Sequence, residues 1–100
     1  MKTVITETTV KSGQEQAWDA VYHDRLAHAK QQPGFVGMEL LIPEGEPDKR
    51  LVVGTWRSKD DWSNWHQTPG FQQTRDRMNA ATQNDGTPRW FDVDTETFGR

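Results

Sequence analysis

The residues best suited to chemistry begin with a short run near the middle of the chain. Trp65 lies three positions after Trp62, and His66 lies four positions after it. A helix would therefore present all three side chains on one face. An imidazole titrates near neutral pH, which would let His66 act as a general base, and the two indoles could wall a ligand site. Two plainer interpretations stay open. Aromatic residues at helical spacing also form ordinary core, and His66 could be a partly exposed residue at its edge.

A second run places Phe71, Arg75 and Met78 on one face of the helical segment that follows. A buried guanidinium needs an anionic partner, which Glu7 or a bound anion would supply to Arg75. Otherwise Arg75 extends to the surface or pairs with another acid there. Glu7 belongs to a strand pattern near the N-terminus, where it either points inward as a base or outward into solvent.

Helix-start signals predict how these side chains are positioned. A strand over residues 51–56 is followed by Ser58 as N-cap, with Asp61 in the capping-box position. Thr68 provides a second N-cap, and Pro69 fits the first helical position because its missing N–H costs nothing there. The pattern therefore predicts a strand that leads into a helix broken at Thr68-Pro69, with its aromatic faces turned toward a sheet.

The first half of the chain predicts one strand and one long helix. Residues 2–11 are rich in Val, Ile and Thr, and a capping box from Ser12 to Glu15 begins a helix that runs to about Gln32. Its apolar stripe is Trp18, Val21, Tyr22, Leu26 and Ala29. The Tyr22 hydroxyl could point into a cavity, or it could reach the surface while the ring packs in the core.

The remaining segments complete the predicted fold. Further strands are expected over residues 35–42, 49–56 and 89–98, with a loop at 83–88. The order β-α-β-β-α-β predicts an α+β, ferredoxin-like fold with a four-stranded antiparallel sheet and helices on one face. The two middle strands are apolar on both sides, so their second face also needs a cover. We expect a homodimer through sheet-to-sheet packing.

Composition limits the classes of partner and compartment. The 100 residues predict a single domain, 1–100, whose five Trp residues offset a hydrophobic content of only 32%. The absence of cysteine excludes disulfides and thiolate chemistry and fits a cytoplasmic protein. No segment is long and apolar enough for a signal peptide or a membrane span. A net charge of -3 with scattered basic residues argues against nucleic acid as a partner.

Two groups of residues have side chains that can bind a metal ion, but the spacing of neither group predicts a metal site. His23 and His28 are five positions apart, which is the wrong interval for two ligands on one helical face. Asp92, Asp94 and Glu96 alternate along the last strand, a pattern typical of a solvated strand edge. We therefore expect no metal site.

Several short motifs resemble one known family. They are Pro33-Gly34-Phe35 before the second strand, Trp56-Arg57-Ser58 after the third, and Trp62-x-x-Trp65 followed by Phe71. In these motifs the chain resembles the antibiotic biosynthesis monooxygenase domain over about residues 3–98. The resemblance implies a dimeric α+β barrel. Its superfamily includes cofactor-free monooxygenases, haem-degrading enzymes and proteins of unknown role, so the fold alone does not specify the activity.

The haem-degrading branch implies an Asn on the first strand, a Trp on the short helix and a haem-ligating His further along. Trp65 matches the Trp, but Glu7 stands where the Asn would be, and the His position falls at Thr74 or Arg75. An Arg keeps its proton and cannot ligate iron at neutral pH. The resemblance therefore disfavours haem degradation of the usual kind.

The cofactor-free branch implies that a small aromatic phenol or hydroquinone is oxidised by O₂ with no cofactor. The pocket would lie between the sheet and residues 59–82, and the deprotonated substrate would itself pass an electron to O₂. Trp65 matches the family's Trp, and Asn64 lies beside it. Phe71 stands where a phenolic residue is expected, so that hydroxyl is absent.

The shared faces and the resemblance together suggest roles for these residues. Trp65 would stack on the substrate, while Arg75 and Asn64 would stabilise the phenolate. His66 or Glu7 would accept the proton. The catalytic candidates are thus Trp65, His66, Arg75 and Glu7, and the substrate-binding candidates are Asn64, Trp62, Phe71, Met78 and Tyr22.

Two alternatives remain. The first is haem binding through a non-standard ligand such as His66, which a haemin titration would reveal. The second is a dimeric module without catalysis that binds a metabolite or a partner. A shallow pocket, or one filled by its own side chains, would favour the module.

Overall fold

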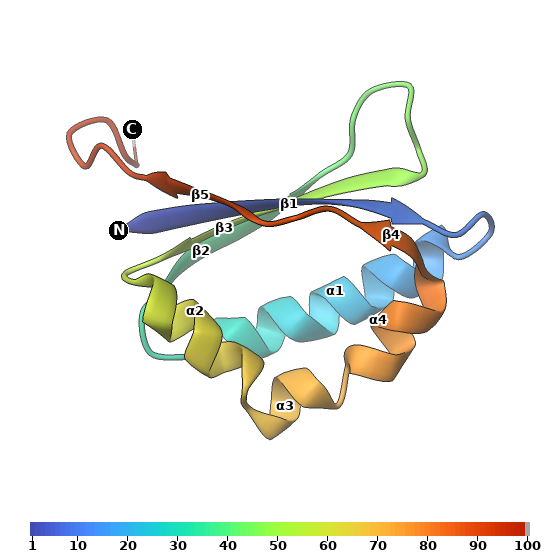
Figure 1. Cartoon of the computed structure of the whole chain (residues 1–100), viewed down its shortest axis with the longest axis horizontal. Helices are drawn as coiled ribbons and strands as arrows, with labels where there is room; N and C mark the ends of the chain where they lie inside the picture. The colour runs from blue at the N-terminus through green and yellow to red at the C-terminus, as the bar shows by residue number, and fades with distance from the viewer. Residues whose placement is uncertain (100) are drawn as a thin grey trace.

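Five antiparallel strands form the sheet of the computed structural model, which describes residues 1–99. The strands are β1 (Lys2–Val10), β2 (Phe35–Leu41), β3 (Lys49–Trp56), β4 (Thr82–Asp85) and β5 (Arg89–Asp92). Their order is β2-β3-β1-β4, and β5 pairs with β1 on the same side as β4. The first strand of the chain therefore lies inside the sheet, between β3 and the two C-terminal strands (Figure 1).

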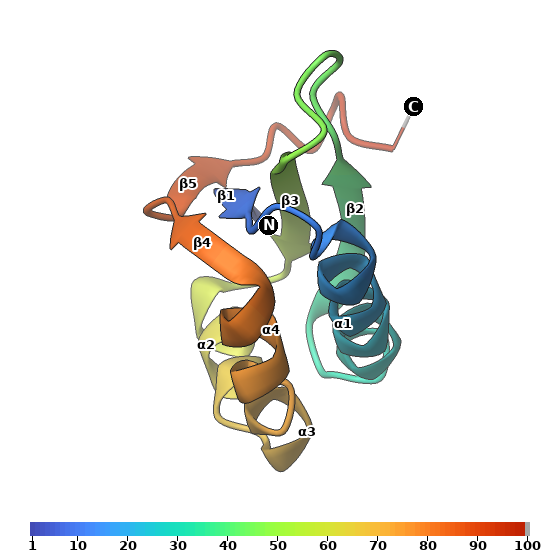
Figure 2. The ribbon, with the colours of Figure 1, turned by 90° about the vertical axis from the view of Figure 1, so that its right-hand side faces the viewer.

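Within residues 1–99, four helices cover one face of this sheet and leave the other face free of helices (Figure 2). They are α1 (Glu15–Ala29), α2 (Lys59–His66), α3 (Pro69–Gln72) and α4 (Arg75–Ala81). The predicted α+β fold, with an antiparallel sheet and helices on one side, is confirmed. Over residues 1–99, none of the helices has both the length and the apolar character that crossing a bilayer requires.

The caps that begin the second helical region are confirmed. The Ser58 hydroxyl oxygen accepts the backbone N–H of Asp61 at 3.2 Å and donates to its carboxylate at 3.0 Å. Thr68 accepts the backbone N–H of Phe71 at 3.3 Å, and Pro69 occupies the first turn. These local bonds set where α2 and α3 begin, and so they set the direction in which their aromatic faces point.

The predicted capping box of α1 is wrong. The helix begins after Gln14, which makes no side-chain cap bond, because Gly13 turns the chain at a φ of 81° and leaves Ser12 outside the helix. The helix also ends at Ala29 instead of Gln32. Its stripe is confirmed as core: Trp18, Val21, Tyr22 and Ala29 are buried, and Leu26 is half-buried.

A second break divides the helix that was expected to run on from Pro69. The Thr74 hydroxyl donates to the backbone carbonyl of Phe71 at 2.6 Å, at the junction of α3 and α4. Such side-chain bonds to the backbone offer an alternative to regular helical bonding. Phe71, Arg75 and Met78 still lie on one side of this bent segment, since all three line the same cavity.

The last strand differs most from the prediction. Residues 82–85, expected as helix end and loop, form β4, while the strand expected over 89–98 ends at Asp92. Between the two strands, Gly86 donates its N–H to the Glu7 carbonyl at 2.7 Å, and a Cβ on Gly86 would come 3.0 Å from that oxygen. Pro88 has no N–H to donate, so pairing with β1 is interrupted there and resumes at Arg89.

Candidate active site

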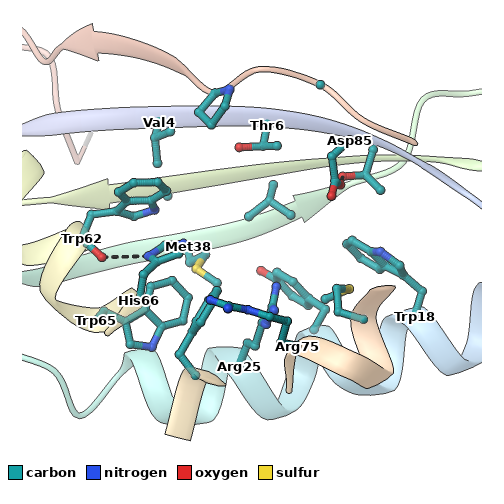
Figure 3. Close-up of a pocket in the computed structure, with 18 of the residues that line it drawn as sticks. Val4, Thr6, Trp18, Arg25, Met38, Trp62, Trp65, His66, Arg75 and Asp85 are labelled. Atoms are coloured by element: carbon teal, nitrogen blue, oxygen red, sulfur yellow. Dashed lines mark hydrogen bonds between the residues drawn. The ribbon is translucent and has the colours of Figure 1, made fainter. Parts of the chain in front are cut away.

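A cavity of about 420 Å³ lies between the sheet and the helices (Figure 3). Val4 and Thr6 of β1, Met38 of β2 and Gly54 of β3 contribute to its sheet side. Seven of the predicted site residues line it: Tyr22, Trp62, Trp65, His66, Phe71, Arg75 and Met78. The two predicted helical faces therefore converge on one open space, which their side chains do not fill.

Glu7 and Asn64 are not among the residues that line this cavity, which corrects both assignments. Side chains of a strand alternate between its faces, and Val4, Thr6 and Thr8 point toward the helices. Glu7 therefore points to the helix-free face, where it is exposed. Asn64 is exposed on α2, on the side away from Trp65. Neither residue can accept a proton from, or stabilise, a ligand in this cavity.

His66 is held in one tautomer by its own helix. Its Nδ1 lies 2.8 Å from the backbone carbonyl oxygen of Trp62 (dashed line in Figure 3). A carbonyl oxygen only accepts, so Nδ1 carries the proton and Nε2 keeps a lone pair when the ring is neutral. Burial lowers the pKa of His66 below its ordinary 6.5, and the charges of Arg25 and Arg75 lower it further against the raising effect of the Trp62 carbonyl. His66 is thus a neutral base at pH 7.

Trp65 is fixed on both sides of its indole. Its ring stacks on Trp56 with centroids 5.3 Å apart, and Phe71 contacts it edge-on at 4.8 Å. The indole N–H donates to Nδ1 of His28 at 3.1 Å. His28 was dismissed as a metal ligand in the sequence, and its contact with Trp65 was missed. The position of His28 on α1, six residues after the buried Tyr22, does not by itself predict a hydrogen-bond partner on another helix.

Arg25 is the most consequential residue that sequence reasoning missed. It lines the cavity from α1, with its guanidinium 4.1 Å above the Phe71 ring centroid and its Nε donating to the Thr74 hydroxyl at 2.7 Å. Burial lowers the pKa of Arg25 to about 10, with Asp85 opposing the shift and Arg75 adding to it. The side chain therefore stays charged at neutral pH. Its position three residues after Tyr22, at the edge of the stripe, was the available signal.

Three residues that line the cavity carry a buried donor with no acceptor in the described part of the chain. The donors are the indole N–H groups of Trp18 and Trp56 and the hydroxyl of Tyr22. Burial raises the pKa of Tyr22, and the charge of Glu39 raises it further, so the hydroxyl keeps its proton and can donate. Buried donors are normally paired, because an unpaired one costs about 1–3 kcal/mol.

The cavity also contains one acid and lacks the features of a metal centre. Asp85 lines it from β4 and accepts a hydrogen bond from the Thr8 hydroxyl at 2.8 Å. Within residues 1–99, no three His, Cys, Asp or Glu side chains gather closely enough to hold a metal ion. An aromatic wall, a neutral imidazole and two guanidinium groups can bind a planar ring and take a proton from it.

Sequence comparison agrees with this architecture. The profile of the antibiotic biosynthesis monooxygenase family matches residues 1–77. The chain belongs to this family. The match includes β1 to α3 and the start of α4, and thus His66, Trp65, Arg25 and Arg75, whereas the cavity residues from Met78 onward lie beyond it.

Two curated relatives of the chain are haem-degrading monooxygenases. One, from Shouchella clausii, is 29% identical over 59 residues, which are 57% of this chain and 55% of the relative. The other, from Halalkalibacterium halodurans, is 35% identical over 46 residues, 44% of this chain and 40% of the relative. The chain thus spans about half the length of the curated relatives it matches.

Solved structures share the fold at low identity. SnoaB from Streptomyces nogalater, a cofactor-independent oxygenase, superposes with a TM-score of 0.82 at 22% identity, covering 92% of this chain and 91% of SnoaB. A protein from Pseudomonas aeruginosa superposes with a TM-score of 0.81 at 16% identity, covering 92% of each chain. At such identities the likeness concerns the fold, and the activity of this family member must be argued from its own residues.

Proposed function

We propose that the protein is a cofactor-independent monooxygenase that oxidises a small aromatic phenol or hydroquinone with O₂. The observation that carries the proposal is the His66 imidazole, neutral and with Nε2 free, beside the aromatic wall of the cavity. A phenol bound there would find a base and a flat apolar surface in the same place. The family membership and the cavity volume support the same conclusion.

The chemistry balances without any other reductant. His66 Nε2 takes the phenol proton, and the phenolate transfers one electron to O₂ to give a phenoxyl radical and superoxide. These recombine at a ring carbon that bears hydrogen and form a C–O bond, and the resulting peroxide anion takes the proton back from His66 to give a hydroperoxide. Loss of water then leaves a carbonyl, so one phenol and one O₂ give one quinone and one water. The substrate supplies all four electrons that reduce O₂.

The residues of the cavity serve either to bind the substrate or to transfer its proton. Trp65, held by Trp56 and His28, is a rigid part of the cavity wall against which the substrate ring can pack. Arg75 stabilises the phenolate charge from the rim of the cavity, where its side chain is exposed. Trp62, Phe71, Met78 and Tyr22 complete the binding surface.

Oxygen uptake tests this proposal. We would measure O₂ consumption with naphthalene- and anthracene-type phenols and hydroquinones, with chelator present and no cofactor added, and subtract the rate with heat-denatured protein. Saturable uptake that weakens in Trp65→Phe and falls by roughly a hundredfold in His66→Gln is expected. Background rates across the whole panel would contradict the enzyme and favour a binding module instead.

Haem chemistry fits these residues poorly, although the curated relatives degrade haem. Among residues 1–99, His66 is the histidine that lines the cavity, and its ring is already packed against Trp62 and Phe71 at centroid distances of 3.9 and 4.1 Å. Haem ligation in this cavity would therefore fall to a ring that is already enclosed by two aromatic neighbours. A haemin titration that gives a Soret band in the wild type and none in His66→Ala would overturn this conclusion.

We also propose that two copies pack through the helix-free faces of their sheets. By strand alternation this face carries Ile5 of β1, Leu51 and Val53 of β3, Leu41 of β2 and Phe91 of β5. Leu41 is 46% exposed and Phe91 37% exposed. Neighbouring large apolar side chains on an open sheet face are typical of an interface between subunits.

A further inference from the structure

Two guanidinium groups lie at the cavity, and within residues 1–99 neither forms an ion pair with a carboxylate. Within residues 1–99 the ion pairs are Lys2–Asp92, Arg50–Asp19 and Arg77–Asp24, and none includes Arg25 or Arg75. Both arginines line the cavity, and the charge of Arg75 acts on Arg25. Asp85 lines the same cavity and attracts Arg25, but it makes its hydrogen bond to Thr8. The cavity therefore has a net positive side.

Arg50 shows how fully a buried guanidinium with a purely structural role is hydrogen-bonded in this protein. Arg50 is only 4% exposed, and its Nε and Nη2 donate to the Asp19 carboxylate at 2.8 and 3.2 Å. Its Nη1 donates to two backbone carbonyls. By contrast, the hydrogen bond of Arg25 within the described chain uses Nε alone, and the Phe71 ring supports the guanidinium from one side. The Nη groups of Arg25 are thus left for a ligand.

A neutral phenol would not satisfy these two charges. An unperturbed phenol keeps its proton until about pH 10, and the neutral His66 ring supplies no negative charge. A carboxylate arrives already ionised, and its two oxygens match the planar fork of a guanidinium. The aromatic walls beside the arginines suit a carboxylate that is attached to a ring.

We propose that the cavity selects an aromatic carboxylate, held between Arg25 and Arg75, with the ring against Trp65. This inference names the substrate class of the proposed oxygenase and rests on that function only for the phenol on the same ring. Arg25 and Arg75 then determine specificity: the ring of an uncharged analogue would still fit, but it would give the Nη groups of the half-buried Arg25 no anionic partner and would gain nothing from the charge of Arg75 at the rim.

Calorimetric titration with a matched pair of inert ligands tests the proposal. Naphthalene-2-carboxylate and naphthalene-2-carboxamide have nearly the same shape and differ in charge, and neither needs to react. The wild type should bind the carboxylate at least about tenfold more tightly than the amide. Arg25→Met and Arg75→Met should each reduce this ratio toward one. Arg77→Met is the control, because Arg77 lies on α4 but pairs with Asp24 at the surface, and it should keep the wild-type ratio.

Folding of the variants is checked by thermal melting. Arg25→Met loses the hydrogen bond to Thr74 but also removes a charge that burial disfavours, so the variant should keep a cooperative melting transition. Equal affinities for acid and amide in the wild type would overturn the proposal, as would no binding of either compound at millimolar concentration. An acid preference that survives in both cavity variants would overturn it too.

The carboxylate subsite and the proposed oxygenase can be refuted independently of each other. Selective binding of the carboxylate, with no O₂ uptake on hydroxynaphthalene carboxylates, would keep the subsite and refute the oxygenase. Uptake on phenols with no preference for the acid would keep the oxygenase and refute the subsite.

Discussion

His66 is the residue whose protonation should set the working pH of the protein. Burial and the two neighbouring arginines keep its pKa below 6.5 in the folded chain, so the base form persists into mildly acidic solution. We expect kcat/KM to be constant near neutral pH and to fall only as the pH drops through this lowered pKa. A profile measured over roughly pH 5–8 checks this, and His66→Gln should abolish the acid limb.

The same shift makes the folded state less stable in acid. At pH values between the lowered pKa of His66 in the folded chain and its ordinary pKa of 6.5 in the unfolded chain, the unfolded chain binds more protons. The contribution of His66 to the free energy of unfolding is therefore fully present above pH 6.5 and is lost as the pH falls through the lowered pKa. Denaturant titrations of the wild type and His66→Gln should diverge in acid; parallel pH profiles would contradict the assigned cause.

His28 should act on the ligand through Trp65. Removing its ring in His28→Ala leaves the Trp65 indole N–H without its acceptor, so the stacking surface becomes mobile. We expect KM to rise by about threefold to tenfold, the value of one hydrogen bond, with a smaller effect on kcat. His28→Gln, which restores an acceptor, should recover most of the loss. Equal losses in both variants would indicate a general packing role instead.

At the scale of the element, β3 provides the floor of the cavity because Gly54 has no side chain. A Cβ at this position would lie 3.4 Å from the Trp56 indole nitrogen and 3.6 Å from Val4 Cγ1, both ordinary contact distances. Gly54→Ala should fold normally, and it should gain about 0.5–1 kcal/mol because glycine weakens a strand interior. Ligand affinity should nevertheless fall, since the methyl group narrows the floor and covers one of the unpaired donors.

Gly37→Ala is the matched control for this substitution. Gly37 lies in β2 opposite Thr55, on the helix-free face, and a Cβ there meets nothing within 4 Å. Titration with the same naphthalene carboxylate should show reduced affinity for Gly54→Ala alone. Equal affinity in the two variants would mean that the ligand does not reach β3.

At the scale of the whole molecule, the helix-free face predicts the oligomeric state. Light scattering coupled to gel filtration should give twice the monomer mass of 11.5 kDa. Val53→Asp places a charge in the proposed interface and should produce monomers, whereas Gln16→Asp on the exposed side of α1 should not. A monomeric wild type would refute the sheet-to-sheet dimer.

The sequence by itself determined the features that depend on neighbours along the chain. The caps at Ser58 and Thr68 act within three residues, and helical periodicity alone places Trp62, Trp65 and His66 on one face. The α+β order follows from the same local patterns. For this reason most of the aromatic wall of the cavity could be predicted before the fold was known.

The tertiary structure decided the features that depend on how distant segments meet. Strand alternation turned Glu7 away from the cavity, because a side chain one residue out of register changes face. Packing of α1 against α2–α4 brought Arg25 to Phe71 and His28 to Trp65, and no local pattern encodes such contacts. The charged side of the cavity therefore appears only in three dimensions, since it is made by residues about 50 positions apart.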